Sequence, residues 1–177
     1  MLAWKLIAFL QLAQPTVVNK PIPNYSHLKR DTTKNFIVLH YDESDSYLGT
    51  RRWLMKKHNN YHYYIERTGK IIKMLDPAFQ ANHAGVSLWR SYLSMNRYSI
   101  GICLQNVPPQ RYTESQYISL AWLIKSLQQR FKDKDSTAYV ILGHADVAVP
   151  RGRKQDPGEH FEWDKLYKML GYDNGTI

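Results

Sequence analysis

The stretch Asn35-Phe36-Ile37-Val38-Leu39-His40-Tyr41, an apolar run that ends in polar residues, predicts a buried β-strand. A second short apolar run, Ala138-Tyr139-Val140-Ile141-Leu142, predicts another strand and is followed by Gly143 and His144. Ligand sites of open α/β sheets gather at the carboxyl ends of strands, so His40 and His144 could share a metal ion. A lone histidine at such a place is more often structural or solvated, so only the two histidines together indicate a metal site.

Strand and helix patterns alternate along the rest of the chain. Further strands are predicted at residues 61–66, 70–75 and 98–104, the first two joined by the turn Arg67-Thr68-Gly69. Helices are predicted at residues 47–58, 114–132 and 163–170. The longest begins with a capping-box pattern at Thr113 and Gln116 and has one apolar face. This alternation predicts one α/β domain with a central sheet.

Residues 1–34 are predicted to form an N-terminal extension that precedes a domain over residues 35–177. We interpret residues 1–13 as an amphipathic helix or docking arm rather than a signal peptide. Only one positive charge is present, Gln11 interrupts the apolar run, and no clean small-x-small cleavage site follows. Pro15, Pro21 and Pro23 then predict an extended lead-in rather than a long helix.

Composition and charge restrict the class of protein. The chain has 177 residues, 44% of them hydrophobic and 22% charged, as in an ordinary soluble domain. Its net charge of +9 favours a polyanionic partner such as a cell wall or an anionic membrane. Nucleic acid ranks low because no nucleic-acid-binding motif is present. The single cysteine, Cys103, cannot form an intrachain disulfide.

A third metal-ligand candidate is Asp156, twelve positions after His144 in a loop rich in Pro, Gly and basic residues. Two histidines and one aspartate with an open position form a catalytic zinc arrangement. The rival is the iron facial triad of oxygenases, for which His144-x-Asp146 is the local match. That triad needs a histidine well downstream, whereas His160 is only sixteen residues away.

Four segments resemble a known family. They are Ile37-Val38-Leu39-His40; Tyr61-His62-Tyr63-Tyr64-Ile65 with Gly69; His83-Ala84-Gly85-Val86-Ser87-Leu88-Trp89 with Asn96 and Ser99-Ile100-Gly101-Ile102; and Gly143-His144-Ala145-Asp146 with Gly152-Arg153-Lys154-Gln155-Asp156-Pro157-Gly158. In this order they are similar to the type 2 N-acetylmuramoyl-L-alanine amidases, bacterial and phage enzymes related to peptidoglycan recognition proteins. The resemblance implies the fold of that family, a central mixed β-sheet flanked by helices.

The resemblance also implies that His40, His144 and Asp156 bind Zn²⁺. Lys154 matches a position where the family keeps a cation near the scissile carbonyl, where an ammonium would stabilise the tetrahedral oxyanion. The simpler interpretation of Lys154 is a surface lysine in a basic loop.

One position departs from the family pattern. Many intracellular and recycling members carry a glutamate two residues after the glycine of Ser-Ile-Gly-Ile, and this chain has Cys103 there. Phage lysozyme-type members and catalytic recognition proteins instead use a tyrosine, which Tyr61 matches. We therefore assign Tyr61 to positioning the water or the oxyanion. Cys103 is interpreted as a buried strand residue rather than a fourth ligand or a nucleophile.

Three further residues are expected to contact substrate. His83 resembles a substrate-contacting residue beside the metal, and Trp89 and Arg90 are expected to line the same groove. Arg90 could pair with a carboxylate of the stem peptide. For Trp89, packing in the core is the alternative.

The sequence thus predicts a zinc-dependent amidase that cuts peptidoglycan between N-acetylmuramic acid and L-alanine. A phage endolysin or lytic enzyme, monomeric and acting on the periplasmic or extracellular side, is the expected setting. Its basic face could contact an anionic membrane or wall surface. The alternatives are a non-catalytic peptidoglycan-binding module and an intracellular amidase that recycles anhydro-muropeptides.

Overall fold

A computed structural model describes residues 14–33, 35–131 and 139–172 of the chain. The N-terminal helix expected within residues 1–13 lies outside the described residues. In the described part, no helix is both long and apolar enough to cross a lipid bilayer.

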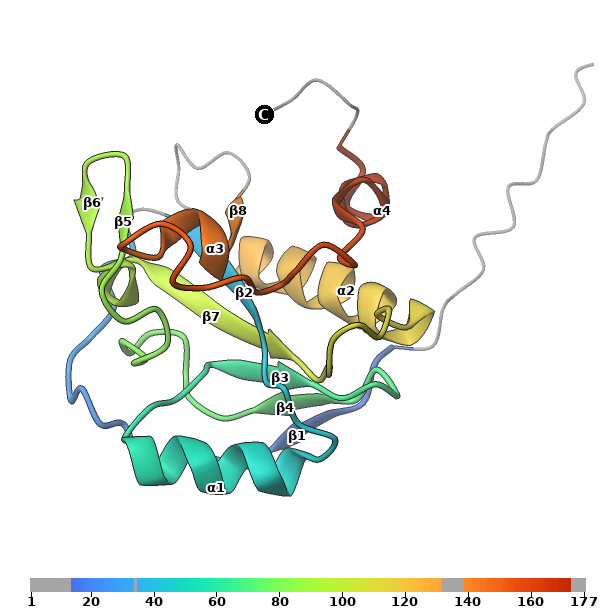
Figure 1. Ribbon diagram of the computed structural model, residues 1–177, viewed down its shortest axis with the longest axis horizontal. Coiled ribbons are helices and arrows are strands. Elements are labelled where there is room, and N and C mark those ends of the chain that lie inside the picture. The colour runs from blue at the N-terminus through green and yellow to red at the C-terminus, as the bar shows by residue number, and fades with distance from the viewer. Residues whose placement is uncertain (1–13, 34, 132–138, 173–177) are drawn as a thin grey trace, which may run out of the picture.

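A six-stranded sheet forms the centre of the fold (Figure 1). Its strands, in spatial order, are β1 (Val17–Asn19), β4 (Ile71–Lys73), β3 (Tyr63–Ile65), β7 (Ser99–Leu104), β2 (Phe36–Tyr41) and β8 (Val140–Gly143). Only β3 and β4 pair antiparallel, and the other neighbours are parallel. The sheet is therefore mixed, and the strands predicted from the apolar runs are confirmed.

Helices cover both faces of the sheet. They are α1 (Tyr47–Lys57), α2 (Glu114–Arg130), α3 (His144–Val147) and α4 (Trp163–Leu170). In Figure 1, α1 lies on one face, and α2 and α4 lie on the other. The predicted capping box of α2 is present, because the Thr113 side chain accepts from the Gln116 backbone N–H and the Gln116 side chain accepts from that of Thr113. The expected α/β domain with a helix-flanked mixed sheet is confirmed.

Strand alternation divides β2 between two cores. Ile37 and Leu39 pack with α2 and α4, whereas Phe36 and Val38 belong to a cluster on the opposite face. His40 continues the Phe36–Val38 side, because side chains two residues apart share a face. The pattern that buries β2 thus also fixes the side of the sheet on which its histidine emerges.

The lead-in before residue 35 is joined to the domain. Strand β1 pairs with β4, Ile22 packs with α1 residues, and the buried Arg30 side chain donates to the Pro77 carbonyl oxygen. The sequence placed residues 1–34 outside the domain, but described residues of this segment complete one edge of the sheet. A three-residue strand is too short to stand out as a sequence pattern.

Several small elements have no sequence prediction. Strands β5 (Leu88–Trp89) and β6 (Tyr92–Leu93) form a separate hairpin, and η1 (Met95–Arg97) follows as a 3₁₀ turn. Helix α3 begins directly at His144, which the sequence placed only in a loop.

Candidate metal centre

Three potential metal ligands meet at the carboxyl end of the central strands. His40 ends the buried part of β2, His144 opens α3 after β8, and Asp156 comes from the following loop. The Nδ1 atoms of the two histidines lie 3.1 Å apart, and each lies 3.0 Å from Oδ2 of Asp156. All three residues are buried. Among the described residues, these three form a group of side chains whose ligand atoms lie close enough together to hold a metal ion.

The geometry of this triangle fits a zinc ion. In a tetrahedral site with bonds of about 2.0–2.1 Å, neighbouring ligand atoms lie about 3.3 Å apart. The three observed separations are close to that value and nearly equal. Three protein ligands leave the fourth position for water or substrate, as in catalytic zinc sites.

The protonation states also suit a cation. Burial and the neighbouring His144 lower the pKa of His40 to about 4, despite the hydrogen bond to Asp156. Burial opposes ionisation of Asp156, but its contacts with His144 and His40 hold its pKa below the usual value. Near neutral pH, His40 is therefore a neutral imidazole and Asp156 a carboxylate, the forms that bind metals.

Asp146 has a structural role instead of a ligand position. Its Oδ2 accepts the backbone N–H of Gly143 at 2.7 Å, which fixes the turn from β8 into α3. The His144-x-Asp146 pair therefore does not assemble the iron facial triad. His144 is oriented separately, since its Nε2 lies 3.0 Å from the carbonyl oxygen of Ala84.

Tyr61 and Cys103 lie together beside His40. The Tyr61 and His40 rings are 5.0 Å apart, and Cys103 is the register partner of His40 on the adjacent strand β7. The Tyr61 hydroxyl and the Cys103 thiol interact, and burial raises the pKa of both well above their usual values. Tyr61 therefore keeps its proton at neutral pH and can donate a hydrogen bond.

A large cleft opens over the metal-ligand candidates. It has a volume of about 1240 Å³. Its lining includes the ligand candidates His144 and Asp156 together with Tyr61, His83 and Lys154. Residues Trp53 and Lys57 of α1 form part of its wall. Lys154 is exposed and lines the same cleft as His144 and Asp156.

The structure places Trp89 and Arg90 away from this cleft. Trp89 is half-buried against the cluster that contains Phe36 and Val38, and the Arg90 guanidinium stacks over the Trp89 ring at 5.9 Å. Neither is among the described residues that line the cleft. Trp89 and Tyr92 of the β5–β6 hairpin both pack against this cluster. The spacing of residues in the sequence does not predict that contact.

Sequence reasoning missed the residue that closes the loop above the centre. Arg153 donates to the carbonyl oxygens of Ala84, Val86 and Val149. It thereby ties the loop after His83 to the loop that carries Lys154 and Asp156. Its position beside Lys154 in the Gly-Arg-Lys-Gln-Asp motif was the available signal.

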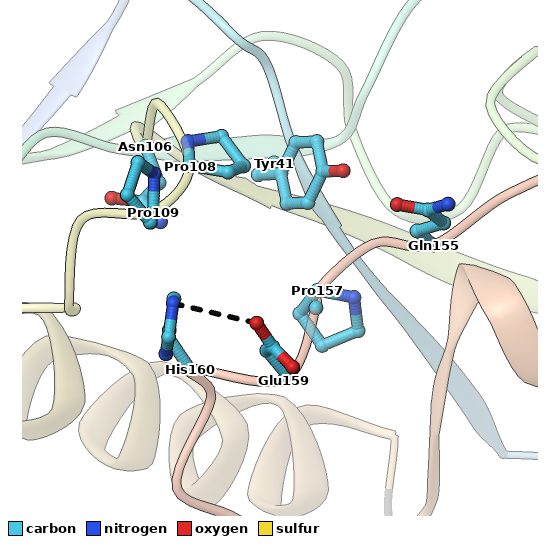
Figure 2. Close-up of a pocket in the computed structure, with 9 residues that line it drawn as sticks. Tyr41, Asn106, Pro108, Pro109, Gln155, Pro157, Glu159 and His160 are labelled. Atoms are coloured by element: carbon cyan, nitrogen blue, oxygen red, sulfur yellow. Dashed lines mark ion pairs between the residues drawn. The ribbon is translucent and has the colours of Figure 1, made fainter.

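A second cavity of about 390 Å³ adjoins the cleft and shares Tyr41 and Gln155 with it. Figure 2 shows prolines along its wall and the pair formed by Glu159 and His160, whose Oε1 and Nε2 atoms lie 3.7 Å apart.

Comparison with known proteins agrees with this geometry. Residues 30–159 match the family model for N-acetylmuramoyl-L-alanine amidase. The chain is 37% identical over 113 residues to the 1,6-anhydro-N-acetylmuramyl-L-alanine amidase AmpD of Haemophilus influenzae, covering 62% of this chain and 57% of that protein. It is 32% identical over 148 residues to the N-acetylmuramoyl-L-alanine amidase AmiD of Escherichia coli, covering 73% and 51%. The chain thus spans little more than half the length of these curated relatives.

Solved structures extend the similarity to the fold. AmiD from E. coli, solved with anhydro-N-acetylmuramic acid-L-Ala-D-γ-Glu-L-Lys, matches with a TM-score of 0.68 at 27% identity, over 81% of this chain and 59% of that chain. The Clostridium intestinale endolysin LysCS matches in fold, with a TM-score of 0.69 at 20% identity over 90% of this chain and 98% of that chain. The resemblance deduced from the four sequence segments is confirmed, and the chain belongs to the N-acetylmuramoyl-L-alanine amidase family.

Proposed function

We propose that this protein is a zinc-dependent amidase that hydrolyses the bond between N-acetylmuramic acid and the L-alanine of the peptidoglycan stem peptide. The observation that supports this most directly is the buried triangle of His40, His144 and Asp156 at the floor of an open cleft. A binding-only module of the same fold has no need for a complete ligand set with a cation beside it.

The chemistry divides between the ion and the side chains around it. Zinc bound at the triangle would polarise the scissile carbonyl and make a water more acidic, with a pKa of about 7. Lys154 would donate a charge-assisted hydrogen bond to the oxyanion that develops on the carbonyl oxygen. Tyr61, which stays protonated, would donate to the attacking water or to the same oxyanion. Asp156 would stay ionised, with its Oδ2 3.0 Å from Nδ1 of both imidazoles, as the third ligand of the ion.

The test is digestion of purified peptidoglycan by the protein as isolated, after chelation, and after zinc is restored. We expect stem peptides with a free L-alanine amine, detected by mass spectrometry, to be lost on chelation and regained with zinc. Asp156→Ala should abolish both zinc binding and release, whereas Asp164→Ala, an exposed aspartate on α4, should change neither. Tight muropeptide binding without any cleavage would instead identify a recognition module.

The biological setting is proposed on two observations. Cys103 replaces the glutamate typical of recycling members, and the net charge of +9 suits an anionic wall, so we favour a phage endolysin or lytic enzyme acting at the cell wall. A second candidate is recycling of soluble muropeptides, favoured by the curated relatives named as 1,6-anhydro-N-acetylmuramyl-L-alanine amidases. Comparing kcat/KM on intact sacculi and on a 1,6-anhydro-muropeptide separates them, since a lytic enzyme prefers sacculi.

A further inference from the structure

His83 makes a continuous hydrogen-bonded chain with the metal-ligand candidate His40. The Nε2 atom of His40 lies 3.0 Å from Nδ1 of His83, and Nε2 of His83 lies 3.3 Å from the Ser99 hydroxyl oxygen. The Ser99 hydroxyl in turn lies 2.6 Å from the carbonyl oxygen of Met95. All of these groups are buried.

The last member of the chain fixes the direction of every bond in it. The Met95 carbonyl can only accept, so the Ser99 hydroxyl donates its proton there and must accept from His83 Nε2–H. The Nδ1 atom of His83 then carries a lone pair and accepts from His40 Nε2–H. His40 is thereby held as the tautomer whose Nδ1 lone pair faces His144 and Asp156.

The surroundings of His83 hold its ring in this place. A Cβ added at Gly101 would lie 2.5 Å from Cγ of His83, so the ring rests directly on the backbone of β7. The Asn96 side-chain oxygen accepts the backbone N–H groups of His83 and Ala84, at 3.0 and 2.7 Å. Ring and backbone are therefore both fixed independently of any substrate.

We infer that His83 is a positioning residue that orients His40 toward the metal, and not a substrate-binding residue. Both ring nitrogens of His83 are already engaged, one by His40 and the other by Ser99, which leaves it no polar atom for a ligand. The inference rests on the proposed zinc site. Hydrogen-bond partners of this kind change metal affinity roughly 10–100-fold when they are removed.

The test compares zinc dissociation constants, measured by competition with a chromophoric chelator, for the wild type and two His83 variants. His83→Phe keeps a ring on Gly101 but removes the acceptor, and should weaken zinc binding roughly 10–100-fold. His83→Asn keeps an acceptor near the Nδ1 position and should restore most of the affinity. Thermal unfolding of the metal-free proteins checks that both variants fold.

The experiment distinguishes failure of the proposed zinc site from failure of the role inferred for His83. A wild type that binds no zinc would refute the zinc site itself. Zinc binding equal in wild type and His83→Phe, with weaker muropeptide binding in the variant, would overturn the inference and restore His83 to substrate contact. Equal loss of affinity in His83→Phe and His83→Asn would also overturn it, because the acceptor would then be irrelevant. Nitrogen-15 chemical shifts of zinc-loaded wild type should show His40 protonated at Nε2.

Discussion

Each metal-ligand candidate is held in place by a different part of the chain. His40 is fixed by the alternation of β2, and His144 by the first turn of α3. The backbone of Asp156 is fixed by a hydrogen bond from the Ala145 N–H to its carbonyl oxygen, at 3.0 Å. Because the three residues meet only in the folded protein, binding of a metal ion by them would be coupled to folding.

Replacement of Lys154 tests the oxyanion role. Lys154→Ala should lower kcat roughly 10²–10³-fold, the effect of losing one oxyanion donor, while zinc affinity is retained. Lys168→Ala is the matched control, since it removes the same charge from the exposed side of α4. The measurement is steady-state release of stem peptide from a soluble muropeptide. Near-normal turnover in Lys154→Ala would assign that lysine to the solvated surface.

Replacement of Tyr61 tests the second proton donor. Tyr61→Phe should lower kcat roughly 10²-fold with zinc affinity unchanged, because only the hydroxyl is lost. Tyr64→Phe is a suitable control, because Tyr64 is also buried, lies on β3 and donates to Asp42 at 2.6 Å, and it is not among the described residues that line the cleft. That variant should reduce the free energy of unfolding and leave kcat near the wild-type value. A smaller effect on kcat in Tyr61→Phe than in Tyr64→Phe would remove Tyr61 from the reaction.

At the scale of elements, β7 supports the centre from the neighbouring strand. Cys103 pairs in register with His40, and Gly101 pairs with Val38. The missing side chain at Gly101 makes room for the His83 ring, while its N–H donates to Nδ1 of His62 at 2.9 Å. Gly101 of β7 therefore holds two imidazoles, that of His83 by packing and that of His62 by a hydrogen bond.

Gly101→Ala should push the His83 ring off β7. We expect a loss of about 1–3 kcal/mol in the free energy of unfolding, as for other overpacked cores, together with weaker zinc binding. Urea unfolding and chelator competition measure the two effects. In a His83→Ala background the clash is absent, so the same glycine substitution should then cost much less. Additive costs in the double variant would show that the two residues do not meet.

At the scale of the whole molecule, buried histidines make stability depend on pH. Burial lowers the pKa of both His40 and His62 from 6.5 to about 4 and holds that of His83 well below 6.5. The unfolded chain therefore binds more protons than the folded one between these values, and stability is complete above pH 6.5 and lost as the pH falls toward 4. The loss is roughly 3 kcal/mol per histidine at most.

Urea unfolding of the metal-free protein at several pH values between 7.5 and 4.5 measures this loss. His62→Gln keeps a donor toward the Phe79 carbonyl but removes one of three buried rings whose pKa lies below 6.5, so the slope should fall by about a third. A free energy of unfolding that stays constant across the range would contradict the burial of neutral histidines.

Patterns within single segments account for what could be predicted from sequence. Period-two and helical apolar spacing, the capping box at Thr113 and the strand-end positions of His40 and His144 are local properties, because burial of one face imposes them on each segment separately. The loop after His144 suggested Asp156, and the family resemblance added Lys154 and Tyr61. The structure groups His40 with His144 and Asp156, and the last two line one cleft with Lys154 and Tyr61.

Only the tertiary structure decided which distant groups touch. The pairing of β1 with β4, the packing of Trp89 into a core and the hydrogen bond from His40 to His83 each join segments whose separation in the chain says nothing about their contact. The tautomer of His40 depends on a carbonyl of Met95, a backbone group present in every residue and therefore invisible to sequence patterns. Sequence thus determined the fold and the type of centre, whereas three-dimensional packing determined how that centre is oriented.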